Sequence, residues 1–276
     1  MCCGRVCCHM SRPLLLRLLP PRLRQAVTYR VYLKQCKKWR ALYEVAPLAF
    51  CTQVSMHNLI PGDIISGNIA FNGFYELDLT REIARLSRTG NLFVDVGANM
   101  GYFSLLWTGL NPDGRVIAFE ASPRITGLLQ NNVTQNGLAD RITIMPQAVG
   151  HKKGVAHFDV GPAEQSGWGG IANAASSANI EVPLVRLDEE LPDAEIDVLK
   201  IDVEGADTWV LYGCEQLLKK KKIHRIFFEE NYSRMAALGI ATSEAREFLS
   251  DVGYACSPFG RGVGEWVAYP NGKNKP

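Results

Sequence analysis

The chain of 276 residues is long enough for one large domain, or for one domain with appendages. Its apolar content of 47% can form a sizeable core, and its charged content of 21% excludes wholesale disorder. The net charge of +2 is unevenly spread, because residues 1–43 hold ten Lys and Arg and no acid, which leaves −8 for the rest (2 − 10 = −8). The body is therefore not a general binder of polyanions, and only the N-terminal segment could be one.

Residues 1–45 form a basic lead-in that we expect to be helical or partly disordered. Four of the eight cysteines crowd the stretch CCGRVCCH, which lacks the paired spacing of a zinc module. The other four are scattered, as in reduced intracellular thiols, so we expect an intracellular protein, in the cytoplasm. The run PLLLRLLP (13–20) is too short to span a membrane. We favour a lead-in helix without special function, and organelle targeting or contact with a membrane surface stays open.

Two elements are expected before the main alternation begins. Gly and Pro punctuate short β-like runs in residues 56–73, which predicts a small hairpin. The apolar spacing of residues 75–87 predicts an amphipathic helix.

From residue 92 onward, apolar strand-like runs alternate with helical segments. Such an alternation predicts an α/β fold with a Rossmann-like, seven-stranded, mostly parallel sheet and helices on both faces, formed by residues 46–276. The last two runs predict an antiparallel hairpin at the sheet edge. The expected strands are 92–96, 115–120, 142–145, 196–201, 223–229, 252–257 and 263–269, and the expected helices are 101–109, 123–136, 205–220 and 242–251.

The connection at about 146–195 is too long for an ordinary loop. It contains two strand-like runs, GVAHFDVG and NIEVPLVRL, around a stretch rich in Gly, Ser and Ala. These features predict an insertion of strands and a mobile loop, which could act as a lid or bind substrate.

The stretch NLFVDVGANMGYFSLL (91–106) predicts a binding site at a strand-to-helix turn. Ligands bind at the carboxyl ends of the strands in such sheets, and Asp95, Gly97 and Gly101 give the pattern D-x-G-x-x-x-G there. This is not the G-x-G-x-x-G dinucleotide pattern, because an acid leads it, and an acid favours a cation such as the ammonium or sulfonium of S-adenosyl-L-methionine. Glu120 ends the next strand at the distance expected for a carboxylate that accepts both ribose hydroxyls.

Several segments together resemble the FkbM-type S-adenosylmethionine-dependent methyltransferases. They are FVDVGANMGYFSLL, GRVIAFEASP, NNVTQNGL, AVG and DVLKIDVEGADTWVLYGC, and the resemblance runs from about residue 74 to 231. It implies a class I methyltransferase fold and O-methylation, often of hydroxyls on sugars or secondary metabolites. Asp207 departs from the family pattern, which usually has Glu there.

We expect the cofactor, S-adenosyl-L-methionine, to be bound at the ends of the first three strands of the alternation and by the helix before them. Glu76 could bind the methionine ammonium or orient the acceptor, although an acid at a helix N-terminus is also favoured by the helix dipole. The backbone around Gln147 could bind the adenine edge. The expected cofactor-binding residues are Glu76, Asp95, Gly97, Asn99, Gly101, Glu120, Ala121, Gln147, Ala148 and Asp202.

A second group of charged residues ends the run IDVLKIDVEG. By strand alternation Lys200, Asp202 and Glu204 point to one side, beside the cofactor strand. Methyl transfer to an alcohol needs in-line positioning and an acceptor for the hydroxyl proton. We expect Asp202 to be the base, assisted by Lys200 and Glu204. The alternative is a structural Lys–carboxylate pair, because buried ion pairs often have no catalytic role.

The run RIFFEEN leaves a metal alternative open. Asp202, Glu230 and Asn231 are similar to the metal set of catechol O-methyltransferase-like enzymes, and such oxygen ligands suit Mg²⁺. We do not favour it, because the FkbM resemblance does not demand a metal.

The expected function is O-methylation of a small hydroxylated molecule. Methylation of an RNA ribose 2′-hydroxyl stays open because of the basic N-terminus, although no nucleic-acid base methylation motif is present. A non-catalytic protein that binds S-adenosylmethionine is the alternative outside catalysis. A nicotinamide oxidoreductase is disfavoured by the missing glycine of its fingerprint.

Overall fold

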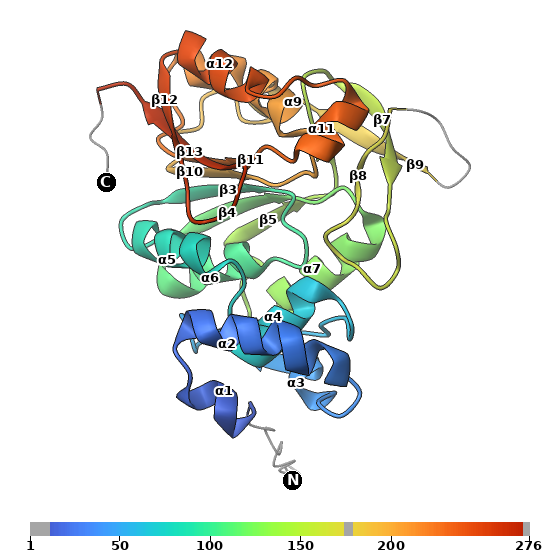
Figure 1. Cartoon of the computed structure of the whole chain (residues 1–276). Helices are drawn as coiled ribbons and strands as arrows, with labels where there is room; N and C mark the ends of the chain where they lie inside the picture. The colour runs from blue at the N-terminus through green and yellow to red at the C-terminus, as the bar shows by residue number, and fades with distance from the viewer. Residues whose placement is uncertain (1–11, 174–178, 273–276) are drawn as a thin grey trace.

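A seven-stranded sheet forms the centre of the computed structural model, which describes residues 12–173 and 179–272 (Figure 1). Its strand order is β12-β13-β11-β10-β3-β4-β5, and only β13 runs antiparallel to its neighbours. This arrangement confirms the predicted Rossmann-like sheet with an antiparallel edge hairpin. The strands are β3 (Leu92–Val96), β4 (Arg115–Phe119), β5 (Ile142–Met145), β10 (Val198–Ile201), β11 (Ile226–Glu229), β12 (Tyr254–Pro258) and β13 (Glu265–Pro270).

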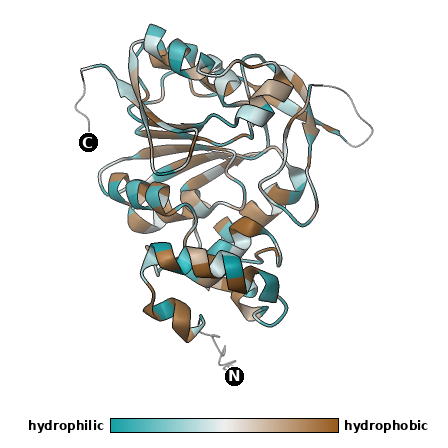
Figure 2. Ribbon diagram, viewed as in Figure 1, coloured by the Kyte–Doolittle hydropathy of each residue, from teal (hydrophilic) through white to brown (hydrophobic). Residues whose placement is uncertain are grey.

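Helices cover both faces of this sheet. Figure 1 shows α5, α6 and α7 on one face and α9, α11 and α12 on the other. The central strands are buried on both faces, as is usual for parallel strands between helices, and Figure 2 shows them as largely apolar. The helices are α5 (Leu77–Leu86), α6 (Tyr102–Leu110), α7 (Pro123–Gln135), α8 (Leu187–Glu190), α9 (Asp207–Tyr212), α10 (Glu215–Lys219), α11 (Tyr232–Leu238) and α12 (Glu244–Asp251).

The helix predicted at 205–220 is broken into α9 and α10. Gly213 lies at the break, where the carbonyl of Gly150 approaches so closely that a Cβ on Gly213 would overlap its oxygen. This approach joins the helix pair to the start of the insertion, a tertiary contact that local periodicity does not contain.

The hairpin predicted at 56–73 is wrong. Strand β2 (Ser55–His57) pairs instead with the earlier strand β1 (Val45–Pro47), and helix α4 (Ile64–Asn72) occupies most of the range. Asp63 caps α4, because its Oδ2 accepts a hydrogen bond of 2.7 Å from the backbone N–H of Ser66.

The lead-in packs on α4 as a further layer. Arg12 donates to the carbonyl of Ala70 at 3.0 Å, and the Thr28 hydroxyl donates to Asn72 Oδ1 at 2.8 Å. The domain boundary at residue 45 stays a prediction, and CCGRVCCH lies outside the described residues. No helix within 12–173 or 179–272 has the length and apolar character needed to cross a bilayer. The elements are α1 (Leu14–Leu18), α2 (Pro21–Val27), a π-helical turn (Thr28–Tyr32), a 3-10 turn (Leu33–Gln35) and α3 (Ala41–Glu44).

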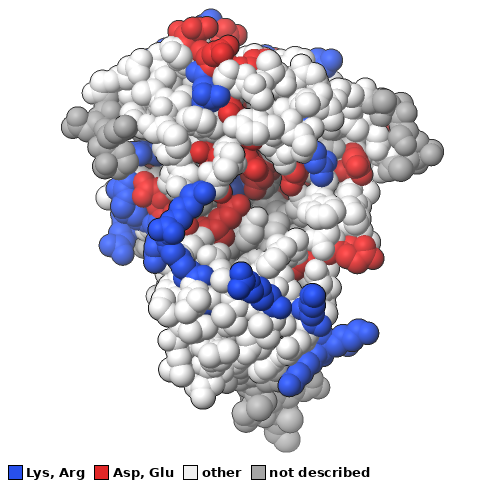
Figure 3. Space-filling view, viewed as in Figure 1, with Lys and Arg blue, Asp and Glu red and all other residues white. Residues whose placement is uncertain are grey.

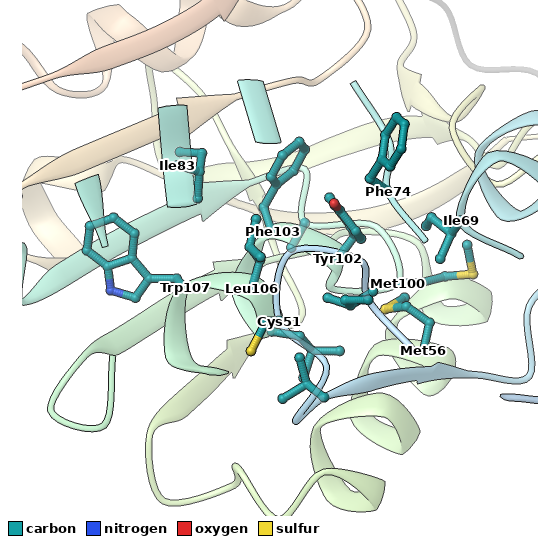
Figure 4. Close-up of a cluster of buried hydrophobic side chains, with 14 of the residues drawn as sticks. Cys51, Met56, Ile69, Phe74, Ile83, Met100, Tyr102, Phe103, Leu106 and Trp107 are labelled. Atoms are coloured by element: carbon teal, nitrogen blue, oxygen red, sulfur yellow. The ribbon is translucent and has the colours of Figure 1, made fainter. Parts of the chain in front are cut away.

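A core cluster joins α4 and α6 to the first strand of the sheet (Figure 4). Ile69 from α4 and Met100 from the turn after β3 are fully or almost fully buried in it. Phe93 of β3 stacks on Trp107 of α6, with ring centroids 5.2 Å apart. This packing fixes the turn after β3 between the sheet and the N-terminal layer.

The insertion forms a second sheet of order β6-β9-β7-β8. Arg124 of α7 holds the loop after β7 by donating to the carbonyls of Val160, Pro162, Ala163 and Gln165 at 2.7–3.3 Å. Residues 160–165 are therefore tied to α7; residues 174–178 of the loop expected to be mobile lie outside the described part. The strands are β6 (Ala148–Val149), β7 (Gly154–Asp159), β8 (Gly170–Ile171) and β9 (Ile180–Val185).

Candidate active site

A cavity opens at the carboxyl ends of β3, β4, β10 and β11, between the sheet, α4 and the insertion. Figure 3 shows acidic side chains gathered around a hollow on this face. The sequence-predicted residues that line the cavity are Glu76, Gly97, Asn99, Glu120, Ala121, Gln147, Ala148, Lys200, Asp202 and Glu204. The topology therefore brings most of the predicted site together.

The turn after β3 is held against the ends of both neighbouring strands. The N–H groups of Gly97 and Ala98 both donate to the carbonyl of Phe119 at 3.0 Å. Gly97 has φ +76°, and a Cβ there would overlap the backbone carbonyl oxygen of Asp202. Only glycine therefore permits this close approach of the β3 turn to the end of β10.

Asp95 lies behind the cavity wall and does not line it. The side chain is fully buried, with Oδ2 accepting from the Ser104 hydroxyl at 2.7 Å and Oδ1 lying 3.6 Å from Lys200 Nζ. Burial raises the pKa of Asp95, and Lys200 opposes that rise. Asp95 therefore lies beneath the cavity wall, and its contact with the cofactor stays a prediction.

Gly101 has a structural role, and its predicted contact with the cofactor stays a prediction. It lies outside the cavity lining, and a Cβ there would come within 2.5 Å of a methyl carbon of Leu129. With φ +90° at the start of α6, Gly101 permits α6 and α7 to pack closely.

Lys200 links the buried and the cavity-facing carboxylates. Its Nζ lies 3.2 Å from Asp202 Oδ2 and 3.6 Å from Asp95 Oδ1, and it donates to the carbonyl of Gly97 at 3.4 Å. Burial acts to lower the pKa of Lys200, but the charges of Asp202, Asp95 and Glu76 outweigh it and raise the pKa overall. Lys200 is therefore a charged group that positions Asp202.

Carboxylates outnumber cations around Asp202. Burial raises the pKa of Glu76 to about 8 and those of Glu204 and Glu229 to about 7, and in each case the charge of Asp202 adds to the rise. Lys200 is the cation among the residues that line this cavity in the described part of the chain. The excess of acid favours a ligand that carries positive charge.

The alternative metal set is not assembled. Glu230 points away from the cavity, where its Oε1 accepts from Arg246 Nε at 2.9 Å, and neither Glu230 nor Asn231 lines the cavity. Glu229 occupies the cavity side instead, as the alternation along β11 requires. Within the described ranges, no three His, Cys, Asp or Glu side chains are grouped so that they could hold a metal ion.

Glu120 and Gln147 mark a polar rim on an otherwise apolar wall. Glu120 accepts from the backbone N–H groups of Asn99 and Ser122, each at 2.9 Å, and burial raises the pKa of its carboxyl to about 7. The buried Oε1 of Gln147 finds no hydrogen-bond donor among the described residues. Phe119 and Phe158 contribute apolar surface beside them. A ring with hydroxyl and amino donors fits such a wall.

Three lining residues have backbone conformations that non-glycine residues rarely adopt. Glu76, Asn99 and Glu204 have φ values of +39°, +51° and +56°. Glu204 follows the end of β10, so this turn, and not strand alternation, directs it to the cavity. Conformations of this kind concentrate at functional sites, where surrounding structure holds them.

Sequence reasoning missed the residues that α4 contributes, whereas it predicted the insertion as a segment that could bind substrate. Ile65 and Ile69 of α4 and Trp168 of the loop line the cavity, although they lie far from the strand ends in sequence. Asp63 joins these two walls, because its Oδ1 accepts from the N–H of Ser166 at 2.9 Å. Glu229 could have been predicted from the sequence, because it lies at the carboxyl end of a predicted strand, where the site residues gather.

The strand order and the cavity at the strand ends define a class I methyltransferase fold. The model of the methyltransferase FkbM domain matches residues 95–256, and the chain belongs to the FkbM methyltransferase family.

Several known proteins that the chain resembles are methyltransferases. Methyltransferase sdnD of Sordaria araneosa is 27% identical over 155 residues, which is 45% of this chain and 60% of that protein. An SAH-bound methyltransferase of Podospora anserina is 11% identical, with 70% of this chain and 78% of that chain covered and a TM-score of 0.45. A SAM-dependent O-methyltransferase of Thermotoga maritima is 14% identical, with 74% and 68% covered and a TM-score of 0.43.

Proposed function

We propose that the protein transfers a methyl group from S-adenosyl-L-methionine to a hydroxyl of a small molecule. The observation that carries the proposal is Asp202, a half-buried carboxylate in the cavity wall that is paired with Lys200 at 3.2 Å. No partner is present for Asp202 Oδ1 among the described residues, so this oxygen is available to a hydroxyl proton.

The charged and polar groups of the cavity match those of the cofactor. Glu120 would accept from the ribose hydroxyls, and Gln147 Oε1 would accept from the adenine amino group, which satisfies its buried oxygen. Glu76 would face the methionine ammonium. When bound, S-adenosyl-L-methionine supplies an electrophilic methyl group.

The chain's own residues then handle the acceptor. Asp202 Oδ1 would accept the hydroxyl proton while the acceptor oxygen bonds to the methyl carbon and the bond from that carbon to the sulfonium sulfur breaks. Lys200 would hold the carboxylate in place through Oδ2. The apolar residues from α4 and the insertion exclude water from the acceptor side. An acid-lined cavity repels a phosphate backbone, which favours a small acceptor over RNA.

The proposal is tested by calorimetric titration of S-adenosyl-L-methionine, followed by transfer of radiolabelled methyl groups to a panel of sugars, phenols, secondary metabolites and mixed RNA. We expect saturable binding and transfer to a hydroxylated small molecule. Transfer to RNA alone would show that the acceptor is RNA and not a small molecule. The absence of any binding of S-adenosyl-L-methionine would contradict the proposal.

We expect Glu120→Gln to weaken binding of S-adenosyl-L-methionine by about tenfold or more, because a hydrogen bond to a charged group contributes about 1.5–3 kcal/mol. The amide keeps the size of the side chain and removes its charge. Asn99 donates to Oε2 and Ser122 to Oε1, so the single amide oxygen can keep one of these two hydrogen bonds. Calorimetric titration measures the change. Glu189→Gln, at an exposed position on α8, is the control and should bind as the unmodified chain does. Equal affinity of Glu120→Gln would remove Glu120 from the site.

A further inference from the structure

Exposed apolar side chains concentrate in the N-terminal layer. Helix α1 shows this most clearly: Leu16 is fully buried in the core, whereas Leu14, Leu15 and Leu18 are 67%, 52% and 75% exposed. The short helix is therefore apolar on its outer side as well, as Figure 2 shows. Further exposed apolar residues of this layer are Leu23, Tyr29 and Val31.

Basic residues of the same layer divide into two groups. Arg12 and Arg24 donate to carbonyls of α4, and Arg22 pairs with Asp78 at 2.9 Å. Arg40 likewise pairs with Glu44, at 3.7 Å. A second group is exposed and has no acidic partner in the described part of the chain: Arg17, Arg30, Lys34, Lys37 and Lys38. In the lowest part of Figure 3, where this layer lies, the charged side chains in view are basic.

The layer is held in a fixed position. Arg24 and Thr28 both contact Asn72 at the end of α4, and Leu42 and Tyr43 belong to the same core cluster as α4. The exposed leucines therefore belong to a layer that packs on the rest of the protein, so their exposure does not come from a chain end that lacks contacts.

We propose that this layer binds the surface of an anionic lipid bilayer. Exposed leucines in the same layer as unpaired Lys and Arg match an interfacial element, in which apolar side chains enter the headgroup boundary and cations contact acidic lipids. A second copy of the chain is disfavoured, because a two-fold contact would set this basic surface against itself. Nucleic acid would use the cations but would leave the leucines exposed.

The test is co-flotation of the full chain with vesicles of phosphatidylcholine alone or with phosphatidylserine added, at low and high salt. We expect binding only to the anionic vesicles, weakened by salt. Leu14→Ser, Leu15→Ser and Leu18→Ser together should weaken binding by at least about tenfold. Arg30→Ser with Lys34→Ser should weaken it by about 25-fold, or fivefold for each charge.

Matched controls change equally exposed residues elsewhere. Val155→Ser with Val263→Ser controls for apolar exposure, and Lys152→Ser with Lys153→Ser controls for charge. Both should bind vesicles as the unmodified chain does. No binding to anionic vesicles, or leucine variants that bind unchanged, would overturn the proposal. Binding of mixed RNA that the lysine and arginine changes weaken and the leucine changes do not would assign the surface to nucleic acid instead.

Discussion

Lys200→Met is expected to destabilise the protein by about 3–5 kcal/mol, because removing one partner of a buried ion pair leaves the other charge uncompensated. Asp95 is fully buried and would keep the Ser104 hydroxyl as its remaining hydrogen-bond donor. Methionine keeps most of the volume beside Phe103, so the loss reports on charge more than on packing. Chemical denaturation at about pH 8 measures the change.

The destabilisation should depend on pH in a definite direction. Burial raises the pKa of Asp95, and the loss of Lys200 removes a charge that opposes the rise. A carboxyl with a raised pKa in the folded state favours folding at low pH and loses that contribution as pH rises through the folded value. The deficit of Lys200→Met should therefore shrink from about pH 8 to about pH 5. Lys200→Met with Asp95→Asn should recover stability at pH 8, and a double variant no better than the single one would remove the Asp95–Lys200 pair as the cause.

Asp202→Asn is expected to lower methyl transfer by about 10²–10⁴-fold, the usual contribution of a positioned general base. The amide keeps the shape of the side chain and can still accept from Lys200, so cofactor binding should change little. Single-turnover transfer to the acceptor, together with calorimetric titration of S-adenosyl-L-methionine, separates the two effects.

Glu229→Gln is the matched control for this experiment. Glu229 lines the same cavity at the end of the next strand, and it shares the acid environment without the contact to Lys200. We expect a change in turnover of less than about tenfold, in contrast to a general base. Full activity of Asp202→Asn, or an equal loss in Glu229→Gln, would argue against Asp202 as the base.

The strands of the alternation are predicted well, because short apolar runs between turn residues mark them. β3 and β5 lie at the predicted limits, although β3 is almost uniformly buried and β5, at the sheet edge, is largely half-exposed or exposed. The elements that were predicted wrongly are those stabilised by contacts with residues distant in the sequence. Helix α4 contains glycine and asparagine and reads locally as a turn region, yet a close approach of Leu33 and Tyr43 to Gly67 holds it as a helix.

The site shows the same division. Residues at strand ends, such as Glu120 and Asp202, follow from topology, because parallel strands bring their carboxyl ends to one edge. The depth of Asp95 was not predicted, because a strand pattern does not reveal it: Val96 reaches the cavity wall, whereas the adjacent Asp95 is fully buried against Ser104 and Lys200. The wall from α4 depends on tertiary packing and was not predicted, whereas the insertion was predicted as a segment that could bind substrate.

The hydrogen bonds from Arg124 to the loop after β7 affect how substrate specificity can change within this fold. The guanidinium contacts main-chain carbonyls of residues 160–165 and no side chain of the loop. Carbonyls are common to every amino acid, so substitutions in this loop can alter the cavity wall while its path stays the same. Evolution or protein design can therefore vary the lining of this wall by point substitution, provided that the arginine is kept.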